Sequence, residues 1–134
     1  MKQWLILLFL LIAIACRQQI DPLVGIWKVN SSFYSATYQI MKKRNQLNGL
    51  VLFYNDGTTR YKHDGTQQQY IFNGLKKKED GQYVDGISGA TTKNDTPKNI
   101  EIKIINKDTL EVTTFVMNKP LVEFWTRQNN EITP

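Results

Sequence analysis

Few side chains of this sequence have the types and spacing that a catalytic or metal centre requires. The only histidine, His63, stands beside Asp64 and Gly65, which predicts an exposed turn residue and gives no histidine-rich metal site or Ser-His-Asp triad. No aspartate series has the order of a calcium loop. A glycosidase pair could still form from acids distant in sequence, although no spacing points to one. We therefore expect no enzyme, no metal and no cofactor.

The first residues instead predict an export signal. Lys2 precedes an apolar run at residues 4–15 (WLILLFLLIAIA) that is about twelve residues long. A membrane-spanning helix needs roughly 20 apolar residues, whereas the core of a secretory signal needs about 7–15 with small residues at its end. Because Arg17 ends the run, we predict a cleaved signal peptide over residues 1–15 rather than an uncleaved anchor.

The only cysteine follows this run directly. The residues Ala13-Ile14-Ala15-Cys16 resemble the lipobox of bacterial lipoproteins. The resemblance implies that Cys16 is acylated and becomes the first residue of the mature protein, and several acyl chains give stable anchoring in a lipid bilayer. Acylation would also remove a thiol that is a liability in an oxidising compartment. The alternative is an ordinary signal peptide with a cysteine near the cut.

A lipoprotein of this kind would belong to the bacterial cell envelope, on the periplasmic or the surface face of the outer membrane. Removing residues 1–15 would leave 16 basic and 12 acidic side chains, a mild net charge of +4. Basic residues cluster at 42–44 and at 76–78, and the second cluster runs into Glu79-Asp80-Gly81, which is typical of a solvated turn.

These basic clusters could contact anionic lipid or polysaccharide surfaces, but more often such charges keep a small domain soluble, which is the interpretation we favour. We expect no nucleic-acid partner, because the protein is exported and shows no recognised binding motif. We also expect a monomer.

Beyond Asp21-Pro22 the apolar residues alternate in short runs instead of following a helical period. The predicted strands cover residues 24–30, 33–42, 46–54, 58–63, 69–75, 82–87, 100–106, 109–118 and 121–127. Between several of them stand Asn-Asp-Gly and similar groups that favour tight turns, because glycine reaches positive φ without a clash.

Eight or nine short strands joined by tight turns indicate an antiparallel meander, and closing it removes exposed sheet edges. The predicted fold class is therefore all-β, a small antiparallel up-and-down β-barrel over residues 23–128. A linker at residues 16–22 would precede the barrel, and a tail at residues 129–134 would follow it.

Alternation along each strand predicts which side chains face inward. The predicted inward sets are Ile100, Ile102 and Ile104 in one strand and Leu110, Val112, Thr114 and Val116 in the next. Tyr34 and Tyr38 also share one face of their strand. Both tyrosines could contact a ligand in an open lumen, or they could pack a filled interior, which is the default for a small barrel.

Gly25-Ile26-Trp27 opens the first predicted strand, and Trp125-Thr126-Arg127 closes the last. These two motifs resemble the ends of lipocalins and of small exported bacterial lipocalin-like domains of the calycin type. The resemblance implies that Trp27 packs across one end of the barrel and that Arg127 lies against it, with Gly25 nearby. A guanidinium over an indole gains about 0.5–2 kcal/mol, so the contact would join the first strand to the last.

Two functions are consistent with these features. The first, which the resemblance implies, is a lipid-anchored binding module that holds a small apolar or amphipathic molecule in its barrel. The candidate lining residues are Tyr34, Tyr38, Leu52, Phe53, Ile102, Leu110 and Val112. The second is a non-enzymatic envelope protein whose packed barrel offers its outer surface to a protein or glycan partner, through an exposed apolar patch around the polar loop from Ser88.

Overall fold

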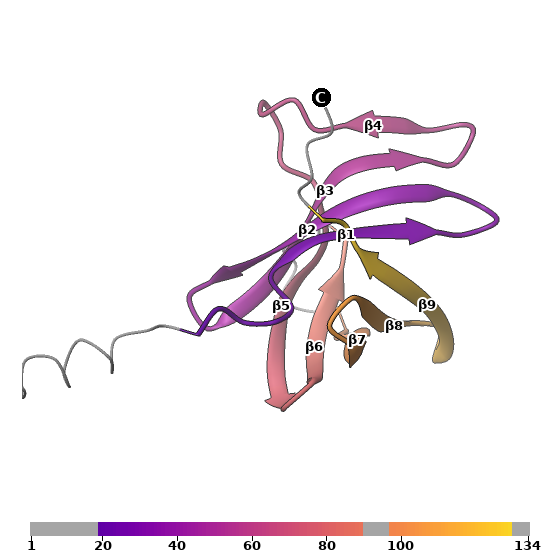
Figure 1. The fold of residues 1–134 in the computed structure, drawn as a ribbon. Helices are drawn as coiled ribbons and strands as arrows, with labels where there is room; N and C mark the ends of the chain where they lie inside the picture. Colours follow the sequence, from indigo (N-terminus) through magenta and orange to yellow (C-terminus); the bar gives the residue numbers. More distant parts are fainter. Residues whose placement is uncertain (1–18, 90–96, 130–134) are drawn as a thin grey trace, which may run out of the picture.

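The computed structural model describes residues 19–89 and 97–129 of the chain. Within these residues the backbone forms nine strands and no helix (Figure 1). The strands are β1 (Gly25–Asn30), β2 (Ser35–Lys43), β3 (Gln46–Asn55), β4 (Arg60–Lys62), β5 (Tyr70–Glu79), β6 (Gln82–Ser88), β7 (Ile100–Asn106), β8 (Thr109–Val116) and β9 (Lys119–Arg127). The predicted all-β class is confirmed.

Eight of the strands close into an antiparallel barrel. They follow one another around the ring in the order β1, β2, β3, β5, β6, β7, β8 and β9, and β9 pairs with β1 to complete it. In Figure 1, β1 to β4 run across the picture while β5 and β6 run down it, so the ring is strongly curved. The predicted antiparallel barrel is therefore present, with β4 as an additional strand.

The strand β4 lies on the same edge of β3 as β5 does. Phe53 pairs with Lys62 of β4, and Leu50 pairs with Tyr70 of β5. The backbone ladder hardly breaks between them, because Leu52 O accepts a hydrogen bond from His63 N (2.9 Å) and Val51 N donates one to Gln69 O (2.8 Å). Residues 64–68 thus leave and rejoin what would otherwise be one strand.

The turn between β3 and β4 forms as its sequence predicts. The carboxylate of Asp56 accepts hydrogen bonds from the backbone N–H groups of Thr58 (2.9 Å) and Thr59 (2.6 Å). These bonds stabilise the charged form and hold the pKa of Asp56 at about 2. Gly57 adopts a φ of +90°, which a residue with a Cβ rarely reaches.

The barrel interior is filled by apolar side chains. The buried cluster comprises Leu23, Trp27, Val29, Ala36, Tyr38, Ile40, Leu47, Val51, Phe72, Leu75, Tyr83, Ile100, Ile102, Leu110, Val112 and Trp125. The ring centres of Tyr38 and Trp125 are 4.8 Å apart, and those of Phe72 and Trp125 are 6.5 Å apart. Gly49 makes room for Phe72, since a Cβ at Gly49 would lie 2.6 Å from that ring.

The inward sets predicted from alternation are largely confirmed. Ile100, Ile102, Leu110 and Val112 are buried, as the polarity of their strands indicated. The prediction is wrong for Val116, which is 48% exposed. It lies at the last position of β8, beside the turn into β9, where the end of the strand is open to solvent.

Candidate functional site

One end of the barrel is closed by an indole and a guanidinium. The register of β1 and β9 places Trp27 opposite Arg127. The Cζ atom of Arg127 lies 4.2 Å from the ring centre of Trp27, within the range of a cation–π contact. The indole Nε1 of Trp27 donates a hydrogen bond to Leu23 O (2.9 Å), so the fully buried ring has no unpaired polar atom.

Arg127 also ties three backbone segments together. Its Nη2 donates to Pro22 O (2.6 Å), its Nη1 to Val24 O (3.2 Å) and its Nε to Lys107 O (3.0 Å). Gly25 lets the guanidinium approach, because a Cβ at Gly25 would lie 2.5 Å from Nη1. A lysine could not donate in three fixed directions in this way.

The segment before β1 covers the same end of the barrel. The hydroxyl of Tyr83 donates a hydrogen bond to Asp21 Oδ1 (2.7 Å), and Leu23 beside it is fully buried. Burial, together with this bond to a carboxylate, raises the pKa of Tyr83 above its usual range. We call this end, with Trp27, Arg127 and residues 21–24 across it, the sealed end.

At the opposite end, which we call the mouth, a carboxylate accepts hydrogen bonds from aromatic side chains. The last pair between β1 and β9 is Val29 with Trp125, so the first half of β9 extends beyond that ladder. Across this region the hydroxyl of Tyr34 lies 2.6 Å from both carboxylate oxygens of Glu123 and donates to them. Trp125 Nε1 donates to the same carboxylate (3.2 Å), and the ring of Tyr34 stacks on Tyr54 at 5.5 Å.

The tyrosines near the mouth are hard to ionise. Burial raises the pKa of Tyr34, and its hydrogen bond to the Glu123 carboxylate raises it further, since ionisation would break the bond and set two negative charges side by side. Burial likewise raises the pKa of Tyr38, and the charge of Glu123 adds to the effect. The hydroxyl groups of Tyr34 and Tyr38 therefore stay protonated well above neutral pH.

The residues predicted to line a ligand cavity do not gather around an open space. Four of them, Tyr38, Ile102, Leu110 and Val112, belong to the packed interior cluster. Tyr34 is half-buried at the mouth and bonded to Glu123.

Leu52 and Phe53 are half-buried and lie outside the cluster. The pairing shifts between Thr37 with Phe53 and Tyr38 with Val51, so Leu52 is the extra residue of a β-bulge. The bulge changes the alternation along β3, and Tyr54 takes the inward place instead, packed against the cluster. Cys16, the predicted lipidation site, lies outside the described residues.

Several large apolar side chains are exposed near the mouth. They are Phe33, Val116, Met117, Leu121, Val122 and Phe124. We call the three that line one depression, Phe33, Val122 and Phe124, the apolar surface. Phe33 (86% exposed) and Phe124 (57% exposed) line one depression of about 310 Å³ together with Val122. The prediction of a patch around Ser88 missed this surface. The signal that could have found it is the alternation of Val122 and Phe124 around Glu123, which puts two apolar side chains on the face opposite Trp125.

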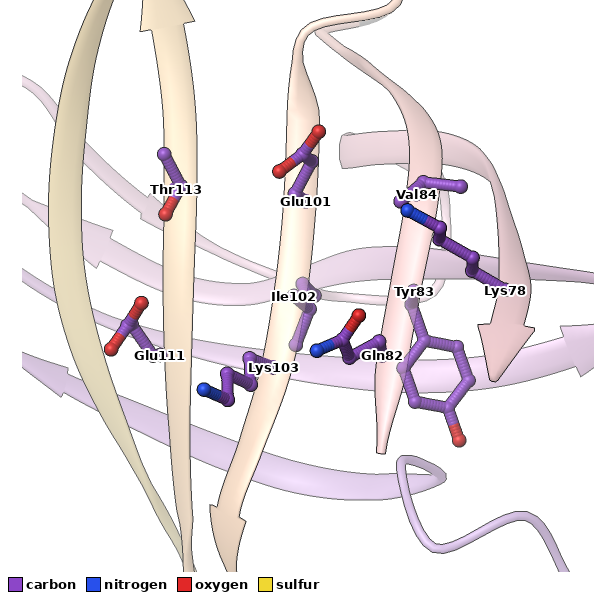
Figure 2. A pocket seen from close by; sticks show the side chains of 9 residues that line it. All are labelled: Lys78, Gln82, Tyr83, Val84, Glu101, Ile102, Lys103, Glu111 and Thr113. Carbon is purple, nitrogen blue, oxygen red and sulfur yellow. The ribbon is translucent and has the colours of Figure 1, made fainter. Parts of the chain in front are cut away.

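The outer face of β6, β7 and β8 is different in character. Lys103 stands opposite Glu111 on the neighbouring strand, and Glu101 opposite Thr113. Figure 2 shows these polar side chains around a shallow depression of about 180 Å³, with the ring of Tyr83 pointing away from them. This arrangement is a charged, solvated strand face.

The histidine and the acidic residues are dispersed over the described part of the chain. No group of three or more His, Cys, Asp or Glu side chains is placed to hold a metal ion in residues 19–89 and 97–129. His63 is half-buried rather than exposed as predicted, because it continues the ladder after β4, with its Nδ1 3.4 Å from the hydroxyl of Tyr61.

Comparison with known proteins adds no relative. No protein-family model, no curated protein and no solved structure matches the chain. The resemblances carried by Ala13-Ile14-Ala15-Cys16, by Gly25-Ile26-Trp27 and by Trp125-Thr126-Arg127 therefore stay predictions. Among the residues that the structure describes, none form a helix of the length and apolar character needed to cross a membrane.

Proposed function

We propose that the protein is a membrane-anchored, non-enzymatic β-barrel of the bacterial cell envelope that acts through its outer surface on a protein partner. One observation carries this proposal, the filling of the interior. Trp27, Tyr38, Phe72, Tyr83 and Trp125 all project into the barrel, and none is more than 2% exposed.

A filled interior argues against the alternative of a ligand held in the lumen. Pockets for small molecules usually have volumes of about 300–1,000 Å³ and are largely formed before the ligand arrives. Here the lumen is occupied by aromatic rings in contact, and the depressions lined by residues of β2, of β7 and β8, and of β9 open to solvent. Emptying the interior would require removing Trp125 from between Tyr38 and Phe72.

The apolar surface supports a protein as the partner. Contiguous apolar side chains are uncommon on monomers and mark interaction sites, where aromatic residues supply much of the binding energy. Phe33 and Phe124 approach each other from the β1–β2 connection and from β9, so one partner could cover both.

The anchoring part of the proposal fits the geometry of the two ends. The N-terminal segment leaves the barrel at the sealed end, where Asp21 and Leu23 pack. In Figure 1 this segment emerges on the side opposite the β1–β2 and β3–β4 turns. If Cys16 carries the lipid, the sealed end faces the membrane and the apolar surface at the mouth faces away from it, toward a partner.

Native mass spectrometry of the full-length protein, purified from membranes of its own host, tests the proposal. We expect the mass of the acylated chain without a bound small molecule. A photo-crosslinking residue in place of Phe33 should capture one protein of reproducible mass in those cells, and Phe124→Thr should weaken the capture. The same crosslinker at Glu101, on the charged face of β7, is the matched control. A small molecule that copurifies in stoichiometric amount would overturn the proposal in favour of a lumen ligand.

A further inference from the structure

We propose that the sealed end is a docking surface for anionic phospholipid headgroups. The inference rests on the anchoring in the proposed function and goes beyond it, because it assigns a second, electrostatic contact between the barrel and the membrane. The basic clusters at residues 42–44 and 76–78 are more than 30 positions apart in sequence. The fold brings both of them to the end from which the N-terminal segment emerges.

The pairing of β3 with β5 joins the two clusters. Leu47, near the start of β3, pairs with Leu75 of β5. The β2–β3 turn, which carries Arg44 after Lys42 and Lys43, comes directly before Leu47, and the lysines at 76–78 come directly after Leu75. Both sets are exposed, and the backbone pairing brings them to neighbouring positions at this end of the barrel. Within the second set, the side chain of Lys78 turns toward Glu101 on the outer face of β6 and β7 (Figure 2).

The N-terminal segment runs beside this surface. Gln19 and Ile20 line a depression of about 700 Å³ together with Lys42 and Arg44 of the β2–β3 turn. Figure 1 shows the segment leaving the barrel next to that turn. A lipid-bearing residue three positions before Gln19 can be at most about 10 Å away along an extended chain. This reach matches the Debye length of about 8–10 Å over which an anionic membrane surface attracts basic side chains.

The net charge of this surface is positive. Six basic residues at 42–44 and 76–78 stand against three acidic residues, Glu79, Asp80 and Asp21, the last of which lines the same depression as Lys42 and Arg44. Asp80 forms a salt bridge with Lys77 (3.0 Å). Among the described residues there is one other salt bridge, between Lys98 and Asp85, and neither of the two involves residues 42–44. The β2–β3 turn is therefore the part of the surface whose charge is free to meet an anion.

The conformation of the β2–β3 turn supports this role. Arg44 has a φ of +59°, in the left-handed region where glycine or asparagine is usual. A glycine at this position would form the turn with less strain. The chain instead keeps a long cationic side chain at the tip of the turn, in a backbone conformation that does not favour it.

The test uses the acylated full-length protein reconstituted into vesicles of phosphatidylcholine alone, or of phosphatidylcholine and phosphatidylglycerol in equal parts. A spin label on Asn45→Cys, in the β2–β3 turn, reports collisions with a nickel chelate attached to headgroups. We expect frequent collisions on the anionic vesicles, fewer on the neutral ones, and a loss of the difference in raised salt. A label on Gln67→Cys, in the segment that leaves the β3 edge, should report few collisions on either.

The decisive variant is Lys42→Gln/Lys43→Gln/Arg44→Gly, whose glycine also relieves the strained turn and so protects folding. Each basic side chain near an anionic surface contributes about fivefold to binding, so the ratio of docked to undocked barrel should fall on the order of 100-fold. The matched control is Arg60→Gln/Lys62→Gln/Lys119→Gln, with the same loss of charge away from the sealed end, and it should leave the collisions unchanged.

Equal collision rates on both kinds of vesicle, or an equal effect of the two triple variants, would overturn the docking surface while leaving the anchor intact. An unmodified Cys16 in the mass spectrum would overturn the anchor instead. In that case sedimentation with the anionic vesicles tests the surface directly, and it survives only if binding is lost with the first triple variant and kept with the second.

Discussion

At the sealed end a guanidinium lies over a buried indole and donates to three backbone carbonyls, whereas at the mouth one carboxylate accepts hydrogen bonds from a tyrosine and a tryptophan. Backbone carbonyls are present whatever the neighbouring side chains are, so the contacts of Arg127 depend on the fold itself. The contacts of Glu123 depend on two particular side chains. The sealed end is therefore built for stability, and the mouth can change its chemistry with few substitutions.

The exposed side chains of the two ends also differ in their chemistry. The sealed end exposes lysine and arginine around the exit of the N-terminal segment, and the mouth exposes phenylalanine, leucine, valine and methionine. A basic surface is suited to a membrane and an apolar one to a protein. This polarity is what an anchored protein needs in order to hold its barrel in one orientation while it presents the other end.

The largest effect should come from breaking the sealed end. Trp27→Ala removes a fully buried indole, the partner of Arg127 and the donor to Leu23 O, and it leaves a cavity. We expect the free energy of unfolding in urea to fall by about 3–5 kcal/mol. Phe124→Ala, which truncates an exposed aromatic ring on the neighbouring strand, is the control. A loss below that of the control would show that the indole does not hold this end closed.

The loss of stability at alkaline pH tests whether the pKa values of the buried tyrosines are raised. The pKa values of Tyr38 and Tyr83 are raised, so the folded state keeps both protons while the unfolded state ionises near pH 10. Stability is thus complete below about pH 10 and is lost as the pH rises through the folded-state pKa values. Between about pH 10 and 11 each tyrosine should cost about 1 kcal/mol. Urea unfolding at several pH values measures the slope. Tyr34 also has a raised pKa and contributes to it, so Tyr83→Phe, which cannot ionise, should remove about a third of the joint contribution of Tyr34, Tyr38 and Tyr83. An unchanged slope in this variant would contradict the assignment to the sealed end.

A smaller effect is expected at the mouth. Tyr34→Phe keeps the ring on Tyr54 and removes only the hydroxyl that donates to Glu123. Because the pair is half-buried, we expect the free energy of unfolding to fall by about 1 kcal/mol, well below the effect of Trp27→Ala. Glu123→Gln is the companion variant. It removes the charge, so the pKa of Tyr34 should move toward its ordinary value in an ultraviolet titration. If that pKa stays where it is, burial alone sets it.

The sequence predicted local features of the fold well. Short alternating runs gave nine strands close to those observed, and Asn-Asp-Gly groups marked turns such as that at Asp56. The two terminal motifs pointed to Trp27 and Arg127, which the register of β1 and β9 places in contact. These features depend on neighbours in sequence, or on strands that a closed meander must bring together.

Other features depend on register between strands, which alternation cannot fix. The bulge at Leu52 interrupts the alternation along β3, and only the pairing with β2 reveals it. Whether β4 and β5 share an edge of β3 depends on how far residues 64–68 loop out. The meeting of two distant basic clusters beside Gln19 follows from the β3–β5 pairing in the same way. The surfaces on which the proposals rest therefore emerged only from the three-dimensional arrangement.

The smallest effect on stability is expected at the apolar surface, where a substitution should reduce partner binding without reducing the free energy of unfolding. Phe124→Thr exchanges an exposed aromatic residue for another good strand former, so the free energy of unfolding should change by less than about 0.5 kcal/mol. Capture of the partner by a crosslinker at Phe33 should nevertheless fall, because the two rings line one depression. Glu101→Thr, on the charged face, is the matched change that should leave capture intact. If Phe124→Thr instead destabilises the barrel as much as Tyr34→Phe does, the exposed rings support the mouth and the difference between a stable end and a binding end is lost.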